Sequence, residues 1–447
     1  MQTRPARPAG ERNRTFAGIL ANTALANLTT SYLWFAITFW IYLETRNVIA
    51  TGVIGGAYML LLAATGISFG TYVDRFRKLP VMRFAGAFTL AMFTAAGVLF
   101  LTAPAGVISA LDRPWFWVFA LIILAGAVVE NLRNIALSTT VTLLIDPDRR
   151  ANANGYVGMV QGLAFIATSV LSGLSIGLLG MGPTVLVAIV LSAGAVAHLA
   201  VLRLPEEAEP APSDAQGGFD LKGAWTAVRV IPGMAALILF TTFNNFIGGV
   251  YMALMDPYGL ELFTVELWGV WIALGATGFL LGGALVGRRG LGPNPIRTLL
   301  VVVAVMGVIG AGFTLREWGW LFVLGIWLYM LCIPAVEAAE QTVIQKVVPL
   351  HRQGRVFGLA SAVEAAAAPV TAFVVAPVAE VWIIPFARSA EGSTALAPLL
   401  GEGTARGIAL VFLVAGLVMV LAAVVAWRSP AYRRLTASYS GPVLAGA

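Results

Sequence analysis

Apolar stretches long enough to cross a lipid bilayer recur along this chain, and they constrain its fold more than any other feature. A helix needs about 20 apolar residues to span the roughly 30 Å hydrocarbon core of a membrane. Twelve stretches meet that length, six before and six after a polar break: 16–42, 50–73, 82–102, 114–144, 153–179, 183–203, 230–256, 263–286, 296–315, 318–346, 355–386 and 405–427. The sequence therefore predicts an all-α integral membrane protein with twelve transmembrane helices.

Composition excludes several classes of protein. Charged residues make up 11% of the 447 residues, against about 25% in an ordinary soluble domain. One cysteine, Cys332, and two distant histidines offer neither a disulfide framework nor a metal site. The net charge of +6 is spread over short segments rather than gathered in one basic domain, which argues against a nucleic-acid partner. We expect the lipid bilayer as the main surroundings and no cofactor.

The distribution of basic residues predicts the orientation in the membrane. Of the 28 lysines and arginines, 22 lie in the N-tail (1–15), the C-tail (428–447) and the loops on the same side. Because such residues accumulate on the cytoplasmic side, both termini are predicted to be cytoplasmic, in the cell's cytoplasmic (inner) membrane. The break at 204–229 then becomes a cytoplasmic linker, in which Phe219 to Arg229 is predicted to form a short helix on the membrane surface. The 387–404 segment becomes an outer loop.

The two halves of the chain, 16–203 and 230–427, resemble each other at an offset of about 203 to 213 residues. Thr29-Thr30 matches Thr241-Thr242, Val129-Glu130 matches Val336-Glu337, and Gln161 matches Glu364. The common order of these matches predicts two pseudo-symmetric six-helix bundles. Such duplicated membrane proteins are typical of transporters that work by alternating access, with the site between the halves.

One loop motif carries a family resemblance. The segment Gly70-Thr71-Tyr72-Val73-Asp74-Arg75-Phe76-Arg77-Lys78 resembles the loop signature of the major facilitator superfamily, and Gly283 to Gly290 is a degenerate second copy without the acid. The segments 149–155 and 352–358 look like those of the twelve-span drug:proton antiporters of the macrolide-efflux and siderophore-exporter type. The resemblance implies the fold of that superfamily and proton-coupled export. The fifth span lacks the Gly-Pro of the antiporter signature, which leaves an importer or facilitator open.

The loop motif also has a physical interpretation as a cytoplasmic gate. An acid at Asp74 can cap the N-terminus of a neighbouring helix or pair with a base, and such a clamp would close the inner side. The motif comprises Gly70, Asp74, Arg75, Arg77 and Lys78. The alternative is a solvated orientation signal, which we favour for Arg77 and Lys78 but not for Asp74, because acids contribute little to orientation.

Ionisable residues inside predicted spans are the candidates for ion coupling, because a charge at mid-span costs roughly 2.5–3.5 kcal/mol on insertion scales and is seldom left without a role. Glu130 and Arg133 stand at i, i+3 and so share one helix face. Glu337 and Glu340 repeat that spacing, and Glu364 lies in the eleventh span. A structural ion pair and proton coupling are equally open for Glu130 with Arg133. For Glu337 we favour proton coupling, since no base lies within one turn on its helix.

Polar residues in the first, fifth and seventh spans are candidates to line a substrate cavity. They are Asn27, Thr30, Trp34, Gln161, Thr241, Asn244 and Asn245. The alternative for each is a hydrogen bond that holds two membrane helices together, worth about 0.6 kcal/mol.

These features predict a monomeric secondary transporter that moves a small amphipathic molecule, most simply by exchange for protons. An importer or facilitator of the same fold is the first alternative, and a non-transporting membrane scaffold or sensor is the second. An enzyme is not expected: the Gly-x-Ser-x-Gly match at 66–70 lies inside a predicted helix, and none of the three lysines follows a glycine as a phosphate-binding loop requires.

Overall fold

A computed structural model describes residues 9–45, 48–104, 107–108, 110–204, 221–400 and 405–440. These residues are overwhelmingly helical, and no strand occurs among them. The chain divides into two compact units. The prediction of an all-α fold is confirmed.

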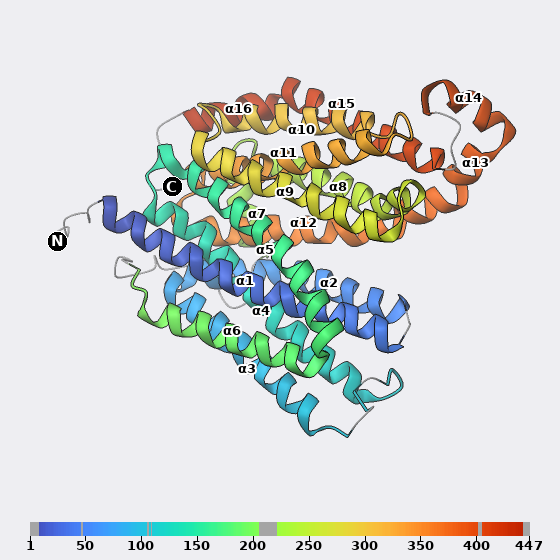
Figure 1. Cartoon of the computed structure of the whole chain (residues 1–447). Helices are drawn as coiled ribbons and strands as arrows, with labels where there is room; N and C mark the ends of the chain where they lie inside the picture. Colours follow the sequence, from blue (N-terminus) through green and yellow to red (C-terminus); the bar gives the residue numbers. More distant parts are fainter. Residues whose placement is uncertain are drawn as a thin grey trace. The chain divides into compact units, whose positions relative to one another are not determined.

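Long helices form the framework of both units (Figure 1). In chain order the first elements are α1 (Ala9–Thr45), α2 (Val48–Arg75), α3 (Lys78–Thr102), α4 (Pro114–Leu144), the 3-10 turn η1 (Pro147–Arg149), α5 (Arg150–Leu179), α6 (Met181–Val201) and α7 (Leu221–Val230). The remaining elements are α8 (Met234–Leu262), α9 (Val265–Arg289), α10 (Pro295–Gly312), α11 (Gly319–Val347), α12 (Leu350–Val378), the π-helical turn η2 (Ala379–Ile383), α13 (Ile384–Arg388), α14 (Ala390–Leu400), α15 (Arg406–Arg428) and α16 (Pro430–Ser440).

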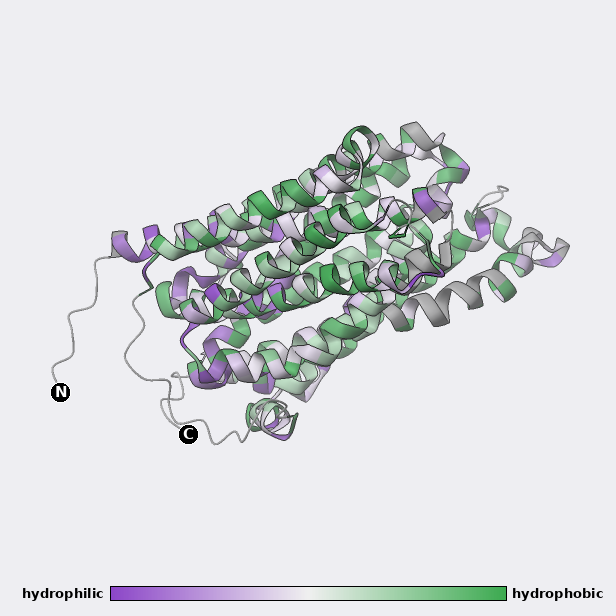
Figure 2. Ribbon diagram, turned by 90° about the horizontal axis from the view of Figure 1, so that it is seen from below, coloured by the Kyte–Doolittle hydropathy of each residue, from purple (hydrophilic) through white to green (hydrophobic). Residues whose placement is uncertain are grey.

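Each of the twelve predicted spans coincides with one long helix, namely α1 to α6, α8 to α12 and α15. Eleven of these, as far as the described residues allow, are long and apolar enough to cross a membrane. The twelfth is α12, whose last third includes side chains outside the described set. Figure 2 shows hydrophobic residues along the helices of each unit and hydrophilic ones gathered near helix ends.

Two segments differ in detail from the sequence-based expectation. The eleventh span was expected to reach residue 386, but α12 ends at Val378 and a π-helical turn follows. The predicted outer loop at 387–404 contains a helix, α14, where a loop alone was expected. The short helix predicted from Phe219 to Arg229 is present as α7, and residues 219 and 220 lie outside the described residues.

The same pairs of helices pack in both units, which supports the internal repeat. In the first unit α1 and α3 each pack against α4 and α6, and α2 packs against α4. In the second unit α8 and α10 each pack against α11 and α15, and α9 packs against α11. The second pattern is the first with each helix replaced by its counterpart at the repeat offset.

The helices α5 and α12 are each divided between the units. Residues 151–162 of α5 belong to the second unit, whereas the rest of that helix belongs to the first. Residues 348–362, which include the start of α12, belong to the first unit, whereas residues from 363 onward belong to the second. Contacts at the beginning of α5 or α12 are therefore internal to a single unit.

Aromatic side chains fill the interior of both units. In the first unit, Trp40 packs edge-on against Phe119 at a centroid distance of 5.8 Å. In the second, Phe412 contacts Phe313 at 5.5 Å and Tyr251 at 5.1 Å. Each buried aromatic ring removes a large apolar area from its surroundings. These contacts hold α1 against α4 in the first unit, and α8 and the end of α10 against α15 in the second.

Lys78 of the loop motif and Arg83, which follows the motif, close helix ends, so Lys78 is not the solvated residue that was expected. Lys78 is buried, and its ammonium donates to the carbonyl oxygens of Val73 at 2.8 Å and Phe76 at 3.3 Å. The Arg83 guanidinium donates to the carbonyl oxygens of Ala200 at 3.0 Å and Leu202 at 3.1 Å. These cations satisfy the unpaired carbonyl groups at the ends of α2 and α6.

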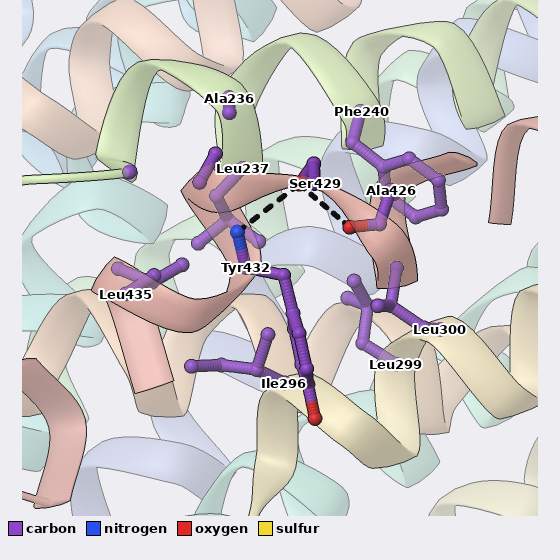
Figure 3. Close-up of a pocket in the computed structure, with 12 residues that line it drawn as sticks. Ala236, Leu237, Phe240, Ile296, Leu299, Leu300, Ala426, Ser429, Tyr432 and Leu435 are labelled. Atoms are coloured by element: carbon purple, nitrogen blue, oxygen red, sulfur yellow. Dashed lines mark hydrogen bonds between the residues drawn. The ribbon is translucent and has the colours of Figure 1, made fainter. Parts of the chain in front are cut away.

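The short helix α16 folds back onto the second unit. The Ser429 hydroxyl donates to the Ala426 carbonyl at 2.7 Å and accepts from the Tyr432 N–H at 3.1 Å, so that it links the end of α15 to the start of α16 (Figure 3). Leu435 is buried, and Gly233 adopts a φ of 88° beside it. A side chain on Gly233 would collide with the Ala431 carbonyl at 2.6 Å, so this contact requires glycine.

Candidate functional site

A buried ion pair occupies the middle of α4 in the first unit. Arg133 Nε donates to Glu130 Oε1, and the two side chains are 1% and 4% exposed. Arg133 Nη1 donates to Asn22 Oδ1 of α1, while the Thr89 hydroxyl of α3 donates to Glu130 Oε2 at 3.0 Å. Three helices are thus joined through one pair of opposite charges.

The arrangement favours the structural interpretation of Glu130 and Arg133. Each carboxylate oxygen of Glu130 has a donor, and the pair carries no net charge. Gly86 of α3 leaves the room for the guanidinium, since a Cβ there would lie 2.5 Å from Arg133 Nη2. A buried pair that is this fully satisfied fixes helix positions.

Three acids lie together in the second unit, and none of them has a basic partner in the part of the chain that the structure describes. Glu340 of α11 accepts from the Thr241 hydroxyl of α8 at 2.9 Å, and its carboxyl interacts directly with that of Glu364 on α12. Glu337 lies one turn earlier on α11 and contributes to the same electrostatic environment. Among the described residues, none of the three acids forms a salt bridge.

The three acids are not completely enclosed by protein. Glu337, Glu340 and Glu364 are all partly exposed. One carboxyl oxygen of Glu364, Oε1, is enclosed and has no hydrogen-bond partner in the described part of the chain. An acid with an unfilled site of this kind can be satisfied by protonation.

The repeat explains why the two units differ in charge. At an offset of 207 residues Glu337 corresponds to Glu130, and Glu340 corresponds to Arg133. The first unit therefore has a cation at the position where the second has another acid. The first unit keeps a neutral pair, and the second has a group of acids.

The predicted cavity residues of the first unit are only partly used in helix contacts. Asn27 donates to Asn134 Oδ1 at 3.0 Å, which joins α1 to α4. Trp34 is partly exposed and stacks on Tyr58 of α2 with ring centroids 4.6 Å apart. Thr30 is buried, and its hydroxyl has no partner among the described residues.

The predicted cavity residues of the second unit fall into three groups. Thr241 is buried and is the only one of them that is hydrogen-bonded to a candidate acid in the described structure. Asn244 is also buried, and its Oδ1 finds no partner in the described residues. Asn245 is exposed, and Gln161 is partly exposed on α5. The structure thus brings Thr241 to the acids and leaves Asn245 apart from them.

The acid of the loop motif binds backbone N–H groups near the beginning of α12, close to the helix N-terminus that one of the two interpretations proposed as its partner. Asp74 Oδ1 accepts from the Gly354 N–H at 2.6 Å, and Oδ2 accepts from the Arg355 N–H at 2.8 Å. The Asp74 side chain is fully buried, whereas Arg75 and Arg77 are exposed. Gly354 and Arg355 are the fifth and sixth residues of α12, so the carboxylate lies beside the second turn of this helix and is stabilised by the N–H groups that it accepts from.

Four glycines let α2 and α12 approach backbone to backbone beside Asp74. A Cβ on Gly66 would lie 2.7 Å from the Gly358 carbonyl oxygen, and one on Gly358 would lie 2.8 Å from Gly70 Cα. A Cβ on Gly354 would meet the Gly70 carbonyl oxygen at 2.5 Å. The close approach brings the Gly354 N–H within reach of Asp74.

The replacement Gly358→Ala is expected to lower the free energy of unfolding by about 1–3 kcal/mol, because the new methyl group meets backbone atoms that cannot move aside. Gly173→Ala on α5 is the matched control, since nothing lies within 4 Å of a Cβ there. The control should stabilise its helix by roughly 0.5–1 kcal/mol. Denaturant unfolding in detergent micelles measures both, and equal effects would contradict the packing argument.

The second unit has a neutral version of the same crossing, which sequence reasoning missed. Asn152 at the start of α5 donates to the Gly287 carbonyl oxygen at 3.1 Å, and Gly287 is the repeat counterpart of Asp74. Asn154 donates to the Thr342 hydroxyl and to Gln345 Oε1, both at 2.9 Å. The sequence signal that could have indicated this crossing is the Asn-x-Asn pattern after Arg150. Its partners on α11 are far away in the chain and become neighbours only on folding.

His351 stands at the start of α12. The pKa of His351 is lowered because desolvation and the guanidinium groups of Arg352 and Arg355 disfavour the imidazolium form. At neutral pH this residue therefore adds no positive charge beside Asp74.

The described residues contain no group of three or more metal-ligating side chains arranged to hold a metal ion. Comparison with known proteins then assigns the family. The model of the Major Facilitator Superfamily matches residues 19–372. The chain belongs to the major facilitator superfamily.

Relatives and solved structures agree with this assignment. Macrolide efflux protein A of Streptococcus pyogenes is 22% identical over 366 residues, which cover 79% of this chain and 87% of that protein. A bacterial homologue of the iron transporter ferroportin, solved in an outward-facing state, has a TM-score of 0.65 at 15% identity and covers 92% of this chain and 98% of its own. A human organic anion transporter has the same TM-score at 14% identity, and the match covers 92% of this chain and 100% of that transporter. The family and the fold are those of transporters.

Proposed function

We propose that this protein exports a small amphipathic molecule across the cytoplasmic membrane in exchange for protons. The observation that carries the proposal is the group of Glu337, Glu340 and Glu364, which lacks a described basic partner. Placing an acid inside a membrane costs free energy, so such acids usually have a function. A carboxyl that binds and releases a proton is the simplest way to use a proton gradient.

The transport cycle follows from the two repeats. We propose that the bundles 16–203 and 230–427, joined by the linker 204–229, work by alternating access. Asp74 and the N–H groups of Gly354 and Arg355 near the start of α12 would form the clamp that holds the inner side closed, and its release would favour the inward-open state. In this proposal the N-tail (1–15) and the C-tail (428–447) are cytoplasmic, and the protein works as a monomer.

Export is favoured over import by the relatives. Macrolide efflux protein A is named for efflux, and the match to it covers 79% of this chain. Trp34 stacked on Tyr58 supplies an aromatic surface in the first unit, and the acids supply charge in the second. An amphipathic substrate uses both kinds of surface.

The test is proton movement in sealed proteoliposomes that contain a pH-sensitive dye. Adding amphipathic drugs from a panel should move protons in the direction opposite to the drug. Drug transport that proceeds without any dependence on a proton gradient would contradict antiport. Drug and proton moving in the same direction would instead identify an importer, and no transport of any compound would favour a scaffold or sensor.

A further inference from the structure

A groove on the second unit, between α10 and α15, has no part in the transport proposal. Its volume is about 570 Å³, within the range of roughly 300–1,000 Å³ that accommodates bound small molecules. Ten residues line it: Leu300, Val301, Ala304, Val305, Val308 and Ile309 of α10, and Ala423, Val424, Trp427 and Arg428 of α15.

The wall of the groove is apolar along its length and charged at one end. Val301, Val305, Val308 and Val424 are exposed and would face hydrocarbon in a membrane. The one charged residue in the lining is Arg428, the last residue of α15. The groove therefore fits a ligand with a long apolar part and a polar end.

A second arginine stands at the same end. The guanidinium of Arg297, in the first turn of α10, lies over the Trp427 ring at 5.7 Å from its centroid. Both arginines are exposed, and within the described residues neither forms a salt bridge. Two cations are thus positioned around the tryptophan that lines the end of the groove.

The two helices that line the groove, and α16 next to them, carry no acid. The sequences of α10, α15 and α16 contain no aspartate or glutamate, whereas α16 adds the exposed pair Arg433 and Arg434. The positive end of the α10 dipole lies at Arg297 as well. No acid on these three helices neutralises the positive charge at this end of the groove.

We infer that this groove binds one anionic phospholipid, with an acyl chain along α10 and α15 and the phosphate between Arg297 and Arg428. Apolar grooves with basic residues at the membrane–water boundary are suited to anionic lipid headgroups. Trp427 is the last residue but one of α15, and aromatic rings at the end of a membrane helix favour the boundary between hydrocarbon and water. The pocket under Tyr432 and Leu435 shares Leu300 with the groove, so α16 covers the wall next to the site (Figure 3).

Native mass spectrometry of the full-length protein in a neutral detergent tests the site with phosphatidylglycerol and phosphatidylcholine as probes. The wild-type protein should bind one phosphatidylglycerol about 30-fold more tightly than phosphatidylcholine, the preference expected from two arginines near a lipid phosphate. The double variant Arg297→Gln/Arg428→Gln should lose this preference. Arg288→Gln/Arg289→Gln is the matched control, because it removes two exposed charges at the end of α9.

A second variant tests the groove itself. Ala304→Phe fills the lining without removing a charge, and should reduce the bound fraction of both lipids. Equal binding of the two lipids by the wild-type protein, or equal loss of preference in both double variants, would overturn the inference. Displacement of phosphatidylglycerol by millimolar inorganic phosphate would overturn it too, because the site would then recognise a free anion and not a lipid.

Discussion

Replacing Arg133 with methionine is expected to lower the free energy of unfolding of this protein by about 3–5 kcal/mol. Glu130 would remain inside the first unit at 4% side-chain exposure with its charged partner removed. Removing one member of a buried ion pair generally costs this much, because the remaining charge is neither solvated nor paired. Urea unfolding in mixed micelles, followed by tryptophan fluorescence, measures the change.

The double variant Glu130→Gln/Arg133→Met separates a structural pair from a functional one. With both charges gone, Thr89 still donates to an amide oxygen at residue 130, and most of the lost stability should return. Drug transport by the double variant should continue if the pair only holds α1, α3 and α4 together. A double variant that is folded but does not transport would contradict the structural role argued for this pair.

The double variant Glu340→Gln/Glu364→Gln is expected to abolish drug-evoked proton movement, leaving the signal of protein-free liposomes. Glutamine keeps the size of the side chain and can still accept from the Thr241 hydroxyl, but it cannot bind or release a proton at neutral pH. Because Glu340 and Glu364 interact directly, the pair is expected to act together, and each single variant should weaken coupling as well.

Two controls distinguish a loss of proton coupling from a variant that simply fails to fold. Drug counterflow, which exchanges labelled for unlabelled drug without net proton movement, should persist in the double variant. Glu391→Gln on α14 removes an exposed acid in the predicted outer segment and should change neither signal. Undiminished proton movement in the Glu340/Glu364 variant would remove these residues from the coupling path and leave Glu337 to be tested next.

The framework of the molecule could be predicted from the sequence because its surroundings impose a simple rule. Every backbone N–H and C=O group in a membrane must be paired within the helix, so an apolar stretch of sufficient length has one available conformation. All twelve stretches, from 16–42 to 405–427, coincide with a long helix. The helix α16 was not expected, because its sequence is polar. Its one buried apolar side chain, Leu435, is covered only when α16 packs against the rest of the second unit.

The roles within the candidate site could be predicted only in outline. Spacing placed Glu130 and Arg133 on one helix face, and they do form a pair. Spacing also singled out Glu337 and Glu340, but it gave Glu337 priority, whereas the contacts gather around Glu340, Thr241 and Glu364. Those three residues come from α8, α11 and α12, and no local pattern relates them.

The sequence by itself determined the class of protein, the number of long helices, the internal repeat and the loop motif that marks the superfamily, because these depend on periodicity and on residues close together in the chain. Only the tertiary structure decided which charges neutralise each other. Asn22 reaches Arg133 over 111 residues and Asp74 reaches Gly354 over 280 residues. Such partners are chosen by the packing of helices far apart in the chain, where the cost of an unpaired polar group is highest.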